Sequence, residues 1–289
     1  MKYRKTITAL VLVIAAASVI CTTAGIFTHE GPGRYEYESI RGKTVIIYGE
    51  GIYRDMTADV AVQGIAQDYV TIILAIPLLL YSLFSARKGS LRGRFLLAGT
   101  AGYFFITYLL YTLMAMYNFL FPVYLILLGS SFFTLFLAIS SFDFSSIKKH
   151  FDNKTPVKTA GGFLIFTSSI ISLMWLGVIL PPLFDGSIIP EEAEHYTTLV
   201  VQGLDLALLL PSAFVSAVLL LRGKGPSYIY TTVYLIFLSI LMTALTAKII
   251  AMGLSGVNII PAVFIIPLIN TAAVICTSLL IKNVTQREG

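Results

Sequence analysis

Long apolar stretches separated by short polar segments form the main pattern of this sequence. Each stretch is about as long as the roughly 20 residues that a helix needs to cross the hydrocarbon core of a bilayer. Continuous apolar runs favour helices over membrane β-strands, which alternate between apolar and polar positions over about ten residues. The pattern therefore predicts an all-α polytopic integral membrane protein with eight transmembrane helices, at residues 6–27, 69–86, 95–117, 119–141, 160–181, 203–222, 227–252 and 257–281.

A short motif occurs twice along the chain. Val62-Gln63-Gly64-Ile65 recurs as Val201-Gln202-Gly203-Leu204, and Pro122 recurs as Pro261, both 139 residues later. We therefore predict two tandem four-helix repeats. A unit with an even number of spans keeps its orientation when it is repeated, so the two halves would be related by an axis along the membrane normal.

The predicted organisation follows from these spans. It comprises a first transmembrane helix at 1–27, an extracytoplasmic β-hairpin loop at 28–68, three transmembrane helices at 69–141 that complete repeat 1, a cytoplasmic loop at 142–159, and repeat 2 at 160–289 with four transmembrane helices and an acidic outer loop at 182–202. A cleaved signal peptide is the alternative for the first stretch. Because residues 160–181 hold the same position in the second half, a retained span is favoured.

The largest polar segment, residues 28–56, alternates β-branched and aromatic residues around glycines, as in Thr44 to Tyr48 followed by Gly49-Glu50-Gly51. This pattern predicts a hairpin of two or three short strands. An isolated hairpin is marginal in water, so it should rest on the membrane domain as a small cap. Thr57 or Asp59 is then predicted to cap a helix that continues into the second span.

Charge distribution adds an orientation to this picture. The chain carries 20 Lys and Arg and 15 Asp and Glu, a net charge of +5. The basic residues gather on one set of alternating loops, from Lys2 to Arg287, while acidic residues other than Asp143, Asp152 and Glu288 lie on the other side. The positive-inside rule predicts cytoplasmic N- and C-termini in a cell membrane. The charge therefore needs no nucleic-acid partner.

Ionisable groups inside a bilayer are costly and mark functional sites or helix pairs. Lys248 and Asp205 lie at similar depth near the outer ends of the seventh and sixth spans, so an Asp205–Lys248 pair is one hypothesis. The alternative is that Lys248 extends along its own helix to the outer interface. Asp68 follows the first copy of the motif and could face a shared outer vestibule, or serve as an ordinary helix cap.

Two helix faces carry further polar side chains. Tyr103, Thr107 and Tyr111 recur every four residues along the third span, and Thr243 and Thr246 lie on one face of the seventh. Such stripes could line a polar cleft between the repeats. Hydroxyl and amide groups also join membrane helices by hydrogen bonds, and Asn270 in the last span is interpreted first in that way.

Catalytic and metal signatures are weak. Glu191, Glu194 and His195 would share one face of a helix starting at Pro190, but no second histidine is near. The two cysteines, Cys21 and Cys276, are predicted at opposite depths, which disfavours a thiol oxidoreductase. We therefore predict no catalytic residue, no metal and no cofactor.

The leading hypothesis for function is non-enzymatic binding or transport of a small solute or lipid between the two repeats. The alternatives are a scaffold or accessory subunit that engages a membrane protein partner, and a membrane-embedded lipid-modifying enzyme. Its candidate ligand-binding residues are Asp205, Lys248, Asp68, Tyr103, Thr107, Tyr111, Thr243, Thr246 and Asn270.

Overall fold

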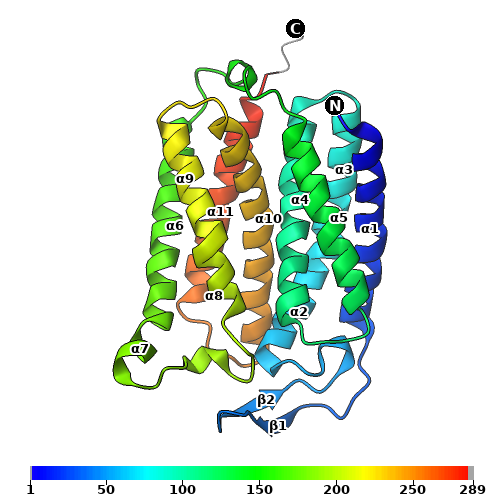
Figure 1. Cartoon of the computed structure of the whole chain (residues 1–289), viewed down its shortest axis with the longest axis vertical. Coiled ribbons are helices and arrows are strands. Elements are labelled where there is room, and N and C mark those ends of the chain that lie inside the picture. Colours follow the sequence, from blue (N-terminus) through cyan, green and yellow to red (C-terminus); the bar gives the residue numbers. More distant parts are fainter. Residues whose placement is uncertain (1, 286–289) are drawn as a thin grey trace.

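A bundle of long helices with a small two-stranded sheet at one end makes up the part of the chain that the computed structural model describes, residues 2–285 (Figure 1). Arg287 and Glu288 lie outside the described residues. The elements are α1 (Arg4–Phe27), β1 (Tyr35–Glu38), β2 (Thr44–Ile47), α2 (Ala58–Val70), α3 (Ile76–Arg87), α4 (Leu91–Met114), α5 (Phe121–Ser140), α6 (Val157–Ile179), α7 (Pro181–Asp185), α8 (Val200–Leu204), α9 (Leu210–Leu221), α10 (Ser227–Leu254) and α11 (Ala262–Lys282).

Within residues 2–285, eight helical stretches are long and apolar enough to cross a membrane. Two of them combine a pair of helices through a π-helical turn, α2 with α3 through Thr71–Ala75, and α8 with α9 through Asp205–Leu209. The chain therefore has the make-up of a multi-pass membrane protein, as the apolar pattern predicts. The second stretch begins at Ala58, directly after Thr57, which confirms a helix that starts before the apolar run.

The prolines explain the two π-helical turns. Pro77 and Pro211 are each the second residue after such a turn. Proline lacks the N–H of the helical hydrogen-bond ladder, and its ring clashes with the carbonyl four residues earlier, which the wider π turn accommodates. The prolines and the turns are 134 residues apart, while the copies of the motif are 139 apart. The helix before the turn is also shorter in the second half: α2 has 13 residues and α8 has five.

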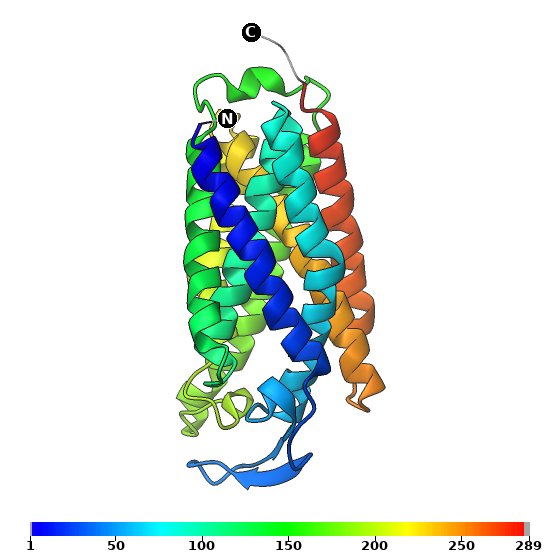
Figure 2. The same cartoon turned by 90° about the vertical axis from the view of Figure 1, so that its right-hand side faces the viewer.

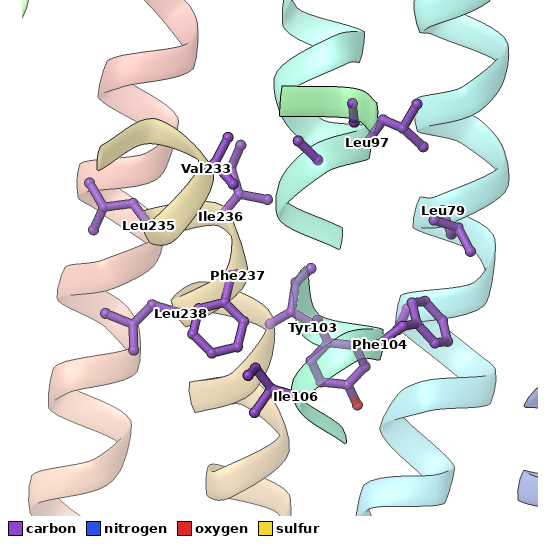
Figure 3. Packing of buried hydrophobic residues seen from close by; sticks show 14 of the residues in the cluster. Leu79, Leu97, Tyr103, Phe104, Ile106, Val233, Leu235, Ile236, Phe237 and Leu238 are labelled. Carbon is purple, nitrogen blue, oxygen red and sulfur yellow. The ribbon is translucent and has the colours of Figure 1, made fainter. Parts of the chain in front are cut away.

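The helices form two groups that meet where α10 packs against α4 and α2 (Figures 1 and 2). In the first half, α1 packs against α2, α3 and α5, and α4 packs against α3 and α5; in the second, α6 packs against α9 and α11, and α10 packs against α9 and α11. Gly99 brings α4 close to α10, because a methyl group there would collide with Ile236. Figure 3 shows buried apolar side chains of α4 and α10, together with Leu79 of α3, in the region where the two groups meet.

The sheet lies at the end of the bundle where α1 ends and α2 begins, which we call the hairpin end. β1 and β2 are antiparallel, with Tyr35 opposite Ile47 and Glu38 opposite Thr44. The predicted hairpin is therefore present. Its connection is Ser39–Lys43, and Gly49–Gly51 leads instead into a 3₁₀ turn, Gly51–Tyr53, that places Tyr53 inside the bundle.

Candidate functional site

A pocket of about 400 Å³ lies at the hairpin end between the two groups of helices. Its walls come from α2 and α4 on one side and from α6, α8 and α10 on the other, with the segment 192–199 along its edge. Apolar side chains supply much of the lining, including Val60, Leu110, Met114, Val201, Leu241 and Leu245. The polar lining residues are Gln63, Gln67, Thr107, Tyr111, Glu192, Glu194, Tyr196, Thr198, Gln202 and Lys248.

Asp68 lies behind this lining, fully buried at 1% exposure. Tyr53 donates a hydrogen bond of 2.6 Å to its Oδ2, and Tyr111 donates one of 3.1 Å to its Oδ1. α1 can approach this carboxyl only because residue 25 is glycine, since a methyl group there would collide with Asp68 Oδ2. A buried carboxyl group with two donors satisfies the rule that buried polar groups are hydrogen-bonded. Asp68 thus fixes the wall of the pocket from behind and does not face the cavity.

A second network holds the next turn of α2 against α4. Gln67 Nε2 donates to the hydroxyl of Tyr103 at 2.7 Å and to that of Thr107 at 3.2 Å. Thr71 and Tyr103 share a further hydroxyl contact of 2.7 Å. Gln67 Oε1 is buried and has no hydrogen-bond partner within residues 2–285. The polar stripe predicted on the third span therefore faces α2, with Thr107 and Tyr111 lining the pocket and Tyr103 fully buried behind Gln67.

Lys248 lines the same pocket from α10. The hypothesis of an Asp205–Lys248 pair is wrong: between residues 2 and 285, the ammonium group of Lys248 has no salt bridge. Asp205 instead accepts a hydrogen bond of 2.8 Å from Trp175 Nε1. Equal depth along two helices does not fix how each is rotated, and here Asp205 faces α6 while Lys248 faces the space between the halves.

Thr243, Thr246 and Asn270 lie together, but away from the pocket. Thr243 donates to Asn270 Oδ1 at 3.3 Å, and Asn270 Nδ2 contacts Thr246 Oγ1 at 3.5 Å. These contacts join α10 to α11. The stripe on the seventh span therefore serves the interhelical role that was the alternative interpretation, and only the stripe on the third span reaches the cavity.

The segment at the edge of the pocket is held by the tip of the hairpin. Arg41 donates to the carbonyls of Glu194 at 3.1 Å and Tyr196 at 2.8 Å, and Lys43 donates to the carbonyl of Glu191 at 2.8 Å. The hydroxyl of Tyr196 accepts a hydrogen bond of 3.3 Å from the backbone N–H of Thr57. Burial raises the pKa of Tyr196 to about 12. This clasp, formed by Arg41 and Lys43 on residues 191–197, ties the first half of the chain to the second.

The geometry gives no support to the metal hypothesis at Glu191, Glu194 and His195. The 3₁₀ turn Glu191–Ala193 ends before Glu194, whose φ is 47°, so the three residues share no helix face. His195 Nε2 lies 3.1 Å from the carbonyl oxygen of Asp55. Among residues 2–285, no group of His, Cys, Asp and Glu is arranged to hold a metal ion.

Sequence reasoning missed several residues of the site. Tyr53 and Gln67 belong to the segment assigned to the hairpin loop, and their contacts depend on tertiary packing. Trp175, the one tryptophan of the sequence, lines the pocket from α6. The sequence does single out Gln63 and Gln202, because both belong to the duplicated motif, and both line the cavity.

Taken together, the fold is that of a multi-pass membrane-type helical bundle, and the site is a partly polar pocket between its two groups of helices. Comparison with known proteins adds no relative: no protein-family model, no curated protein and no solved structure matches the chain. The pocket itself must therefore guide the assignment of function.

Proposed function

We propose that this protein binds a small solute or lipid in the pocket between its two halves and that it does so without catalysing a reaction. One observation carries the proposal: the pocket combines an apolar lining with a cluster of polar groups on helices of both halves. Ligand sites are typically concave and mostly apolar, with a few placed polar groups that fix orientation. The volume of about 400 Å³ lies at the small end of the usual range for such sites.

The proposal includes an orientation and an origin. The chain lies in the cell membrane with both termini in the cytoplasm, so the hairpin and the pocket are extracytoplasmic, as the positive-inside rule predicts. The halves are two tandem repeats. The paired π-helical turns and their prolines support this origin, as does the central packing of α4 on α10, the third span of each half.

Orientation can be tested by labelling. Ile40 is 93% exposed in the hairpin connection, and Cys21 and Cys276 are both buried. A membrane-impermeant maleimide added to intact cells should label the Ile40→Cys protein. A Lys149→Cys protein, changed at the opposite end, should be labelled only after the cells are opened. The reverse result would invert the proposed topology.

Binding can be followed with a reporter that the chain already contains. Trp175 is the one tryptophan of the sequence and lines the pocket. In phosphatidylcholine nanodiscs, we would titrate octanol, octanoate, octylamine and dihexanoylphosphatidylcholine and record Trp175 fluorescence together with the melting temperature, which a ligand of the native state raises. At least one probe should give a saturable change.

A pair of variants tests whether that change comes from the pocket. Val201→Phe adds bulk to a lining position on α8 and should weaken binding at least tenfold. Leu208→Phe, in the neighbouring π-helical turn at a site that is 52% exposed and outside the lining, should leave it unchanged. If no probe binds, or if both variants behave as the wild type does, the proposal fails.

A scaffold role is the second candidate, because all four residues of β1 are exposed and its outer edge has no strand beside it within residues 2–285. An exposed strand edge can pair with a strand of another protein. Tyr35→Pro should then abolish co-purification of a membrane partner while leaving binding of the probes intact. The clasp disfavours this role, since the tip of the hairpin is already engaged with residues 191–197.

A further inference from the structure

Lys248 supplies the positive charge of the pocket. Among the described residues that line it, Lys248 is the one basic side chain, and it has no hydrogen bond or salt bridge within residues 2–285. A cation at membrane depth normally pairs with another group, because its desolvation is costly. Asp68, the buried carboxyl group on α2, is not part of the lining and already accepts from Tyr53 and Tyr111. The ammonium group therefore has room for an anion that comes from outside the chain.

Gln67 supplies a second, independent requirement. Its side chain lines the pocket at 2% exposure, and its Nε2 donates to Tyr103 and Thr107. Its Oε1 is buried and has no partner in the part of the chain that the structure describes. An unsatisfied buried acceptor is destabilising, and a donor on a ligand removes that cost. The pocket thus has a place for a negative charge and a place for a hydrogen-bond donor.

The acidic residues of the pocket lie on a different element. Glu192 and Glu194 belong to the segment 191–197 at the edge, which the clasp holds to the hairpin. Lys248 lies on α10, which also supplies Leu241 and Leu245 to the lining, and α2 and α4 pack against this helix. The cation and the acids of the lining therefore come from different elements, and among residues 2–285 the Oε2 atom of Glu194 is buried without a hydrogen-bond partner.

We infer that the ligand is an anionic amphiphile whose acid group binds Lys248, whose hydroxyl or N–H group donates to Gln67 Oε1, and whose short apolar part packs against the remaining lining. This inference rests on the proposed function and names its substrate class. The acid can belong to a water-soluble compound or to the head group of a membrane lipid, and both present the same chemistry to the pocket.

The test compares eight-carbon probes that differ in one group at a time, with Trp175 fluorescence in phosphatidylcholine nanodiscs as the readout. Wild-type protein should bind octanoate at least tenfold more tightly than octanol, and 3-hydroxyoctanoate about fivefold more tightly than octanoate. Lys248→Met should remove the preference for the acid over the alcohol, and Lys248→Arg should keep it. Gln67→Leu should remove only the preference for the hydroxyl group.

Lys158→Met is the matched control, because it removes the same charge from an exposed position near the start of α6, outside the pocket lining. It should bind all probes as the wild type does. If Lys248→Met fails to fold, as judged by size-exclusion chromatography, the wild-type probe series and Lys248→Arg still decide the question. A wild-type protein that binds octanol as well as octanoate would overturn the inference and leave the proposed function standing, whereas binding of no probe would remove both.

Nanodiscs that contain a minority of dioleoylphosphatidic acid distinguish the two sources. If a lipid head group occupies the site, Trp175 fluorescence should already be shifted in these discs and octanoate should cause no further change. If the ligand is a free acid, octanoate should give the same response in both kinds of disc. Lys248→Met should lose the shift caused by the lipid head group and should bind octanoate only as weakly as octanol. An unchanged response in that variant would contradict the inference.

Discussion

The two aspartates near the π-helical turns have very different surroundings. Asp68 in the first half is 1% exposed, accepts from two tyrosines and lies against Gly25 of α1. Asp205 in the second half is half-buried and accepts from Trp175 alone. The helices around them differ in the same way, since 44% of the residues in the most apolar stretch of α1 are buried, against 17% in α6. The pocket therefore has one tightly packed wall and one loosely packed wall.

The largest expected difference is at the two aspartates themselves. Asp68→Ala leaves two buried tyrosine hydroxyls without their acceptor and should lower the free energy of unfolding by about 2 kcal/mol. Asp205→Ala releases one half-buried indole N–H and should cost less than about 1 kcal/mol. Denaturant unfolding in the same detergent measures both. Equal losses would show that the two walls are equally rigid.

The glycines of the duplicated motif sharpen the comparison. A methyl group on Gly64 would lie 3.1 Å from the ring of Tyr53, while one on Gly203 meets no atom within 4 Å. Gly64→Ala should therefore cost about 1.5 kcal/mol through overpacking. Gly203→Ala should be neutral or stabilise the protein by up to about 1 kcal/mol, because alanine favours the helix. The melting temperature should fall in Gly64→Ala and should stay unchanged or rise in Gly203→Ala, and a shared loss would contradict the packing described above.

The clasp can be broken without touching either wall. Arg41→Ala removes the hydrogen bonds to the carbonyls of Glu194, Tyr196 and Thr197. Local opening of that segment should become easier by about 1 kcal/mol, equivalent to roughly fivefold faster amide exchange. Hydrogen exchange followed by mass spectrometry measures the exchange rate of this segment. Arg34→Ala, an exposed arginine of the same loop, is the control and should leave exchange unchanged.

The smallest effect is expected between α10 and α11. Asn270→Leu removes the contacts to Thr243 and Thr246, and interhelical hydrogen bonds in membranes average about 0.6 kcal/mol. The free energy of unfolding should fall by about that amount, and binding of the eight-carbon probes should not change. Weaker binding in this variant would mean that the network reaches the pocket after all.

Sequence alone predicts much of this fold, because length and continuous hydrophobicity decide where a chain can cross a bilayer. It also predicts that Thr107 and Tyr111 share a face, since their spacing of four residues matches the helix period. It does not predict which helix that face meets. The bonds of Tyr111 to Asp68 and of Gln67 to Thr107 depend on how α2 and α4 are rotated about their axes. In the second half, the rotation of the α8–α9 stretch and of α10 about their own axes likewise turns Asp205 and Lys248 away from each other.

Gln67 shows where the apolar pattern itself is insufficient. The predicted second span starts at residue 69, whereas the helix starts at Ala58. Its first turns contain polar residues whose partners are other side chains of the bundle, including Tyr103 and Tyr53. Hydropathy measures the average preference of a segment for lipid and misses polar groups that are buried inside the protein.

The clasp also has a consequence for the order of events during synthesis. Arg41 and the carbonyl of Glu194 are 153 residues apart in the chain. At about 5–20 residues per second, roughly 10–30 s pass between the synthesis of the hairpin and that of its partner segment. Throughout that interval the inserted first half presents Gln67 and Thr107 to the lipid without α10 beside them. Insertion factors that shield polar faces of nascent helices would therefore be needed most before the seventh span is made.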